Sequence, residues 1–144
     1  MILAHSIIGI MPVSNSEFSW FWLIGSVVAD IDHIFVLYKY KIFSYAKIVD
    51  IMRFEDRNGI HFKTKYMHSI FGAVVTTVPV FLISKEGALY YFIAYIIHLI
   101  IDWPDTDEKQ YLYPFKKKFK GFLPILSKTE IVFTTLLLIF YFAL

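Results

Sequence analysis

The stretch FSWFWLIGSVVADIDHIFVLY, residues Phe18–Tyr38, decides the fold class. It is apolar and long enough to cross a bilayer as an α-helix, for which about 20 residues are needed. Asp30, Asp32 and His33 interrupt it near its carboxyl end. Ionisable side chains inside a membrane are costly, so they mark functional sites by default. The stretch therefore predicts a membrane span that carries part of a site.

The composition of the whole chain favours the same class. Of its 144 residues 58% are hydrophobic and 18% are charged, whereas soluble domains are about 45–50% apolar and about 25% charged. No cysteine is present, which excludes a disulfide scaffold and cysteine-ligated metal sites. The length allows one domain, residues 1–144. We expect an all-α, integral-membrane helical bundle.

Five apolar segments divide the chain, at about 2–13, 18–38, 67–84, 88–103 and 129–144. Short joins connect the first segment to the second and the third to the fourth, which is typical of antiparallel helical hairpins. The sequence thus predicts two similar hairpins followed by a C-terminal helix. The first segment lacks a charged region before it and a small-residue cleavage site, so we do not expect a signal peptide.

The basic residues predict the orientation of the bundle. All except Lys85 lie in the two longer connections, about 39–66 and 104–128, and positive residues mark the cytoplasmic side. We therefore expect a multi-pass protein of a prokaryotic inner membrane whose N-terminus is inside. Membrane lipids are the expected partners, and a net charge of +2 does not favour nucleic acid. The run Lys116–Lys120 either binds anionic lipid or attracts phosphate headgroups.

Seven ionisable residues lie within or beside the apolar segments: His5, Asp30, Asp32, His33, His68, His98 and Asp102. The spacing of His98 and Asp102 places them on one helix face, which Tyr91 and Tyr95 extend. Asp30 and His33 are three residues apart and also share a helix face, whereas Asp32 points elsewhere unless the helix is irregular there. The hairpin topology brings all seven groups to the cytoplasmic ends of their helices, at one depth.

A short motif opens the first helix of each predicted hairpin. HSIIG begins at His5 and HSIFG begins at His68. Two hairpins of equal orientation form a parallel repeat, and sites in such proteins lie at the repeat interface. Gly9 and Gly72 would allow close helix approach.

Imidazoles and carboxylates without sulfur suit Zn²⁺, with Mn²⁺ or Fe²⁺ as alternatives. Seven ligands exceed the needs of one tetrahedral ion, so we expect two ions bridged by an aspartate, as is usual in phosphoester hydrolysis. Asp32, if it does not bridge the ions, is the candidate general base. Two alternatives remain open: a hydrogen-bonded His/Asp network that only holds the bundle together, and a non-catalytic metal-binding or transport protein.

The order of the motifs resembles a known family. HSIIG, GSVVADIDH (Gly25–His33), MHSIFG, HLIID and YPF (Tyr113–Phe115) resemble the predicted membrane-bound metal-dependent hydrolases, whose bacterial relatives are small inner-membrane proteins under DNA-damage (SOS) control. These are distantly similar to zinc-dependent phospholipases C, which are all-helical. The resemblance implies a divalent-metal hydrolase that acts on phosphoesters, including those of lipids. It also implies that the seven residues form the metal site.

The chain departs from that family at two places. Ala29 stands where the family usually has proline, which bears on whether the chain breaks sharply there. Lys63–Met67 replace the family's His-Arg pair and threonine, and His61 is the candidate substitute for the histidine. Without that arginine a bidentate phosphate contact is lost, and Lys63 or Lys65 can act only as point charges.

Overall fold

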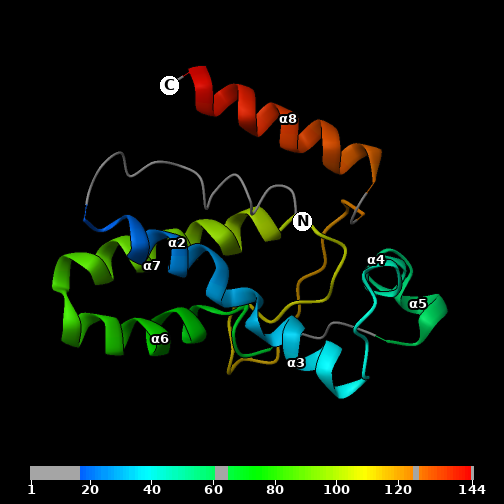
Figure 1. Ribbon diagram of the computed structural model, residues 1–144, viewed down its shortest axis with the longest axis horizontal. Helices are drawn as coiled ribbons and strands as arrows, with labels where there is room; N and C mark the ends of the chain where they lie inside the picture. The colour runs from blue at the N-terminus through cyan, green and yellow to red at the C-terminus, as the bar shows by residue number, and fades with distance from the viewer. Residues whose placement is uncertain (1–16, 61–64, 125–126, 144) are drawn as a thin grey trace.

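The computed structural model describes residues 17–60, 65–124 and 127–143. Within these ranges the chain is helical, and the β-structure consists of isolated bridges. This confirms the expected all-α class. The predicted segment 2–13 lies outside the described residues. Figure 1 shows the helices α2 Ser19–Val27, α3 Ile31–Lys39, α4 Tyr45–Arg53, α5 Glu55–Asn58, α6 Ile70–Ile83, α7 Lys85–Asp102 and α8 Lys128–Ala143, with a 3₁₀ turn, η1, over Val28–Asp30.

The predicted second hairpin is formed by α6 and α7, which lie antiparallel (Figure 1). A serine begins each helix. The backbone N–H of Gly72 donates to Ser69 Oγ at 3.0 Å, and that of Gly87 donates to Ser84 Oγ at 3.0 Å. These side chains satisfy backbone donors that have no partner within the helix. They also fix where the hairpin turns.

Helix α2 packs lengthwise on α7, and the two helices run parallel. The contact requires Gly25, because a Cβ atom there would lie 2.3 Å from the carbonyl oxygen of Tyr91. Nearer the start of both helices, the rings of Phe18 and Tyr90 stack with centroids 5.3 Å apart. This close approach brings the end of α2 against the polar half of α7.

The prediction that Gly72 allows a neighbouring helix to approach closely is wrong. A Cβ atom at Gly72 would meet the carbonyl oxygen of Tyr66 at 2.3 Å and that of Met67 at 3.0 Å. Gly72 therefore makes room for the chain that precedes α6, which folds back onto the helix start. Gly25 takes the role that had been assigned to Gly72, and Gly9 lies outside the described residues.

The stretch Phe18–Tyr38 is interrupted by the 3₁₀ turn rather than forming one regular helix. The Ser26 carbonyl accepts a hydrogen bond of 2.7 Å from His98 Nδ1. A carbonyl engaged from outside the helix is one recognised cause of a local break. The break thus occurs although Ala29 replaces the family's proline. A 3₁₀ turn has about 3.0 residues per turn instead of 3.6, so it changes the direction in which the following residues point.

The first basic connection contains α4 and α5, which the sequence analysis did not predict. Before them, α3 ends at Lys39. Two residues later, Lys41 has a left-handed backbone conformation, with a φ of 53°. The amide of Ile42 donates to the carbonyl of Leu37 at 2.9 Å, and the amide of Lys41 donates to that of Tyr38 at 3.1 Å. This is a Schellman ending. Ile42 is buried there together with Ile51.

The second basic connection, residues 103–127, has no helix in its described part but is held by backbone hydrogen bonds. Lys109 and Phe119 exchange two of 2.9 Å. The amide of Gly121 donates to Asp105 and that of Ile70 donates to Tyr111, at 2.8 and 2.9 Å. The connection is therefore attached to the start of α6.

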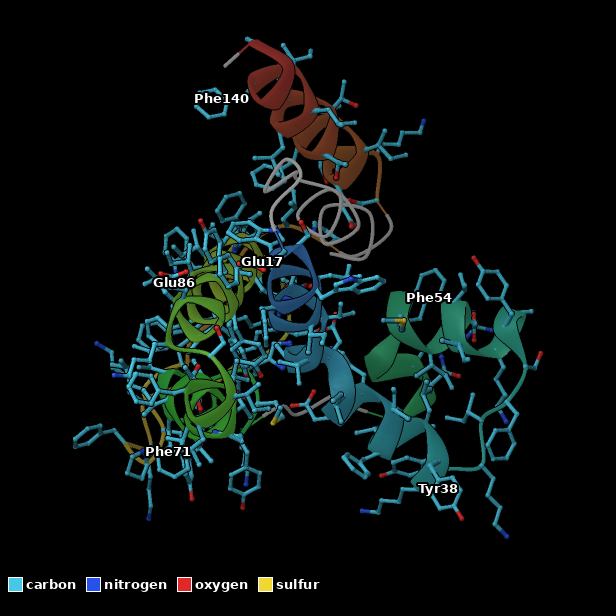
Figure 2. The ribbon with its side chains drawn as sticks, turned by 60° about the vertical axis from the view of Figure 1, so that its left-hand side comes forward. Glu17, Tyr38, Phe54, Phe71, Glu86 and Phe140 are labelled. Atoms are coloured by element: carbon cyan, nitrogen blue, oxygen red, sulfur yellow. The ribbon has the colours of Figure 1, made fainter. Side chains whose placement is uncertain are left out.

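Among the described helices, one stretch, Ser19–Lys39, is long and apolar enough to cross a membrane. Helices α6 and α8 are shorter, and their outward faces are apolar. Leu82 and Ile83 are 81% and 79% exposed. In Figure 2 the labelled rings of Phe71 and Phe140 point away from the helices that carry them.

Candidate metal centre

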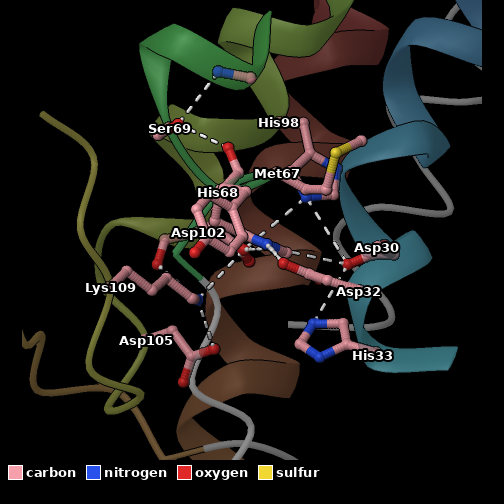
Figure 3. A network of polar contacts seen from close by, with 12 residues as sticks. Asp30, Asp32, His33, Met67, His68, Ser69, His98, Asp102, Asp105 and Lys109 are labelled. Atoms are coloured by element: carbon pink, nitrogen blue, oxygen red, sulfur yellow. Dashed lines mark hydrogen bonds and ion pairs between the residues drawn. The ribbon is translucent and has the colours of Figure 1, made fainter. Parts of the chain in front are cut away.

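The predicted site residues lie at the end of the α6–α7 hairpin opposite the turn at Ser84, and Figure 3 shows them side by side. They come from four places in the chain: η1, the start of α3, the segment just before α6, which carries His68, and the end of α7. His5 and His61 lie outside the described residues. The residues brought together are Asp30, Asp32, His33, His68, His98 and Asp102.

Two histidines form the buried centre of this cluster. His68 and His98 are both 0% exposed. His68 Nε2 lies 3.1 Å from Asp102 Oδ2 and 3.6 Å from Asp30 Oδ1. His98 Nε2 lies 3.7 Å from each of the same two oxygens. The two nitrogens thus face the same pair of carboxylates.

The other nitrogen of each ring is held by an oxygen. His98 Nδ1 lies 2.7 Å from the Ser26 carbonyl oxygen, which can only accept, so Nδ1 carries the proton. His68 Nδ1 lies 3.3 Å from Asp32 Oδ2. Metal-binding histidines almost always donate their second ring N–H to a carboxylate or a carbonyl, which turns the bare nitrogen toward the ion. Both rings have that arrangement.

The distances suit a tetrahedral divalent ion. Zinc bonds to nitrogen and oxygen of about 2.0–2.2 Å place neighbouring ligand atoms about 3.3–3.5 Å apart. The four nitrogen–oxygen separations around His68 and His98 are 3.1, 3.6, 3.7 and 3.7 Å. Within the described part of the chain, His68 Nε2 is buried and makes no hydrogen bond of acceptable geometry. The residues present therefore fit a metal ion.

A second set of ligand atoms adjoins the first. Asp32, His33 and His68 form a group whose ligand atoms lie within 4.8 Å of one another, as do Asp30, His68 and His98. Asp30 Oδ1 lies 3.4 Å from His33 Nε2, so this carboxylate contacts histidines of both groups. Asp30 is the carboxylate placed to bridge them.

Asp32 belongs to the cluster because the helix before it is irregular. In a regular helix Asp32 would point to another face than Asp30 and His33, and η1 supplies the predicted irregularity. The cluster is also open on this side. The side chains of Asp30, Asp32 and His33 are 30%, 20% and 17% exposed, whereas that of Asp102 is 2% exposed. A ligand would reach the centre past η1 and the start of α3.

The backbone around His68 is fixed by neighbouring side chains. The Tyr95 hydroxyl donates to the carbonyl of Met67, and Ser69 Oγ donates to that of Tyr66 at 2.6 Å. Tyr91 and Tyr95 are buried together with His98 and Asp102 on one face of α7. The predicted stripe along this helix is confirmed.

Asp105 and Lys109 adjoin the cluster and were not among the residues predicted from the sequence. Lys109 Nζ lies 3.1 Å from Asp102 Oδ2 and 2.9 Å from Asp105 Oδ2. Burial lowers the pKa of Lys109, but the two carboxylates outweigh this effect, so its pKa is raised above the usual value and the amine stays charged. The only available signal was the i, i+4 spacing of Asp105 and Lys109 directly after HLIID, which is common in exposed loops.

One family matches nearly the whole chain. The model of the family described as YdjM inner membrane protein covers residues 2–144. This confirms the expected membrane location, and its description names neither a hydrolase nor a metal. Comparison with curated proteins and with solved structures gave no match. The likeness to zinc-dependent phospholipases C therefore has no support from these comparisons.

Proposed function

The chain belongs to the YdjM inner membrane protein family, and on that premise we propose that it is a divalent-metal-dependent hydrolase of phosphoesters. The substrate class is a lipid phosphoester, and Zn²⁺ is the preferred ion. The site is the His/Asp cluster around His68 and His98.

One observation carries the proposal. Two buried imidazoles have Nδ1 held by an oxygen and turn Nε2 toward the same two carboxylates, at 3.1–3.7 Å. Among the described residues His68 Nε2 is buried and makes no hydrogen bond of acceptable geometry, whereas a cluster that served only to hold helices together would gain more from a fully hydrogen-bonded imidazole. The arrangement favours a metal ligand set over a structural network.

The residues divide into inner and outer groups. Asp30, His68 and His98 would hold the first ion, with Asp102 beside them, and Asp32 and His33 are the remaining ligands for a second. His68 belongs to both groups, but its Nδ1 is held by Asp32 and its Nε2 can bind one ion only, so Asp32 and His33 would hold a second ion without it. A bound divalent ion polarises a phosphoryl oxygen and makes water a stronger acid.

Asp32 has two separate roles in this proposal. Its Oδ2 accepts from His68 Nδ1 and orients that ring. Its Oδ1 has no hydrogen-bond partner among the residues described. That oxygen is buried within the cluster, so where Asp32 does not bind a second ion it would take a proton from a water held inside the cluster, which is the task of a general base.

The membrane setting favours a lipid substrate. We propose a multi-pass bundle in a prokaryotic inner membrane, with the site at the cytoplasmic leaflet. Both basic connections join the helices at or near the site end of the bundle, and cytoplasmic loops carry the excess of basic residues. The open side of the cluster would then face the headgroup layer. The exposed lysines at 116–118 and 120 would raise the local concentration of anionic headgroups.

The experiment that tests the proposal measures bound metal and hydrolysis on the same detergent-purified preparations. After loading with Zn²⁺, Mn²⁺ or Fe²⁺, mass spectrometry should find one to two equivalents in the wild type and less than a tenth of that in His98→Ala. Glu86→Gln, an exposed change at the far end of the same helix, should bind as the wild type does. Loaded wild type should release phosphate or headgroup from phospholipid or lipid phosphate, and His98→Ala should not.

Two results would contradict the proposal in different ways. Equal metal content in the wild type and His98→Ala would remove the metal centre. Metal binding without hydrolysis of any phosphoester in the screen would leave the non-catalytic metal-binding protein as the function.

A further inference from the structure

Lys109 is an unusual residue for the connection between α7 and α8. The other lysines of that connection are exposed, whereas Lys109 is 2% exposed. Its ammonium group donates to Asp105 Oδ2 at 2.9 Å and to the main-chain carbonyl of Asp102 at 3.3 Å. It also lies 3.1 Å from Asp102 Oδ2. Burying a charged amine is costly unless it is paired in this way.

The connection is built to hold that amine in place. The backbone N–H and carbonyl of Lys109 both form hydrogen bonds with the backbone of Phe119. The main-chain carbonyl of Asp105 accepts from the amide of Gly121. A Cβ atom at Gly121 would lie 2.1 Å from the carbonyl oxygen of Pro104. Only glycine permits this approach of the two chain segments. Lys109 and Asp105 therefore sit on a fixed backbone rather than on a mobile loop.

The oxygen that Lys109 contacts is the one that faces the histidines. Asp102 Oδ2 lies 3.1 Å from Lys109 Nζ and 3.1 Å from His68 Nε2 (Figure 3). One carboxylate oxygen thus joins the lysine to the centre of the cluster. Asp105 Oδ2 contacts the same amine at 2.9 Å, so Lys109 is paired with two carboxylates.

We infer that Lys109 is a positioning residue, which with Asp105 fixes the Asp102 carboxylate as a ligand of the metal centre. The inference rests on the proposed function, because it assigns a role toward the same ion. The hydrogen-bonded partners of ligating carboxylates orient them, and loss of such a partner weakens metal binding by about 10–100-fold. Lys109 does not touch the ion or a substrate.

The sign of the effect separates positioning from simple electrostatics. Removing a positive charge beside a cation site strengthens cation binding when charge alone matters. Loss of affinity on removing Lys109 therefore reports lost orientation of Asp102. A lysine that served only to hold the connection would lower the unfolding midpoint and leave the affinity of the folded protein unchanged.

The test uses the full chain in detergent and makes two measurements. The first is the affinity for Zn²⁺, obtained by titration. The second is the visible absorption of Co²⁺ bound in place of Zn²⁺, which is strong in four-coordinate sites. Lys109→Met should bind Zn²⁺ at least about 10-fold more weakly and should give a weaker Co²⁺ spectrum. Lys118→Met, which removes an exposed lysine paired with Glu108, is the matched control and should match the wild type.

Lys109→Arg keeps the charge but changes the shape of the donor, and it covers the case in which Lys109→Met does not fold. It should also lose affinity, because the guanidinium fork cannot reproduce the same contacts. Folded Lys109→Met with unchanged or tighter Zn²⁺ binding would overturn the inference, as would wild-type affinity in Lys109→Arg. Absence of Zn²⁺ binding in the wild type would instead remove the proposed metal centre itself.

Discussion

At the scale of single residues, Lys41 has a backbone conformation that its side chain disfavours. A non-glycine residue in the left-handed region costs about 1–2 kcal/mol, yet Lys41 has a φ of 53°. The two hydrogen bonds that end α3 and the burial of Ile42 offset this cost. The residue is therefore strained but stable.

Replacing Lys41 by glycine should stabilise the protein by about 0.5–1 kcal/mol, because glycine adopts positive φ without strain. The measurement is the thermal unfolding midpoint in detergent, followed by circular dichroism. Lys39→Gly, at the last residue of α3, is the control; it relieves no left-handed φ and should lower the midpoint. A lower midpoint for both variants would show that the left-handed ending does not control stability.

The identity of the site residues was predictable from the sequence, but their contacts were not. Histidine and aspartate in apolar segments are conspicuous, so Asp30, His68 and His98 could be selected without a structure. Which nitrogen of each ring faces the carboxylates depends on the Ser26 carbonyl and on Asp32, and nothing in the chain order indicates those contacts. Lys109 was missed because a lysine in a basic connection is normally exposed.

At the scale of elements, the long apolar helices were predictable and the short amphipathic ones were not. Helices α6, α7 and α8 follow the apolar segments closely. Helices α4 and α5 lie in a basic connection; the few apolar residues of α4 pack on the end of α3 and give no long periodic pattern, and α5 has no apolar residue. The break in the span depends on a hydrogen bond from α7, which local sequence cannot reveal.

The packing of α2 on α7 gives a prediction at this scale. Gly25→Ala should destabilise the protein by about 1–3 kcal/mol, because the added methyl would overlap backbone atoms of Tyr91 that cannot move aside. Zn²⁺ binding should weaken in the same variant, since Ser26 is the next residue. Thermal unfolding and Zn²⁺ titration measure the two effects. Val27→Ala, on the exposed side of α2, is the control and should change both by little.

If Gly25→Ala unfolds at the wild-type temperature and binds Zn²⁺ equally well, the close contact between the helices does not position the Ser26 carbonyl. Of this part of the chain, only the turn η1, which carries Asp30, would then contribute to the site.

At the scale of the whole molecule, the expected orientation in the membrane can be tested with little background, because the chain has no cysteine. Glu86→Cys places a thiol at the turn between α6 and α7, and Lys117→Cys places one in the second basic connection. An impermeant maleimide applied to intact spheroplasts should label Glu86→Cys only. Lys117→Cys should react only after the membrane is opened, because basic connections stay in the cytoplasm.

Labelling of both positions from the same side would contradict the spanning hairpin. Labelling of Lys117→Cys alone would invert the orientation and place the cluster on the outer side. A variant with cysteine at Ser127 gives a third position on the cytoplasmic side and should behave as Lys117→Cys does.

The 3₁₀ turn has a consequence for how the protein meets bilayers of different thickness. It divides the stretch Ser19–Lys39 into two helices, and the Ser26 carbonyl, just before the turn, is hydrogen-bonded to His98 on α7. A helix whose length does not match the bilayer responds by tilting or bending. Here each helix can tilt about the turn while the turn keeps its place on α7. We therefore expect the depth of the cluster to stay constant when the lipid chain length changes.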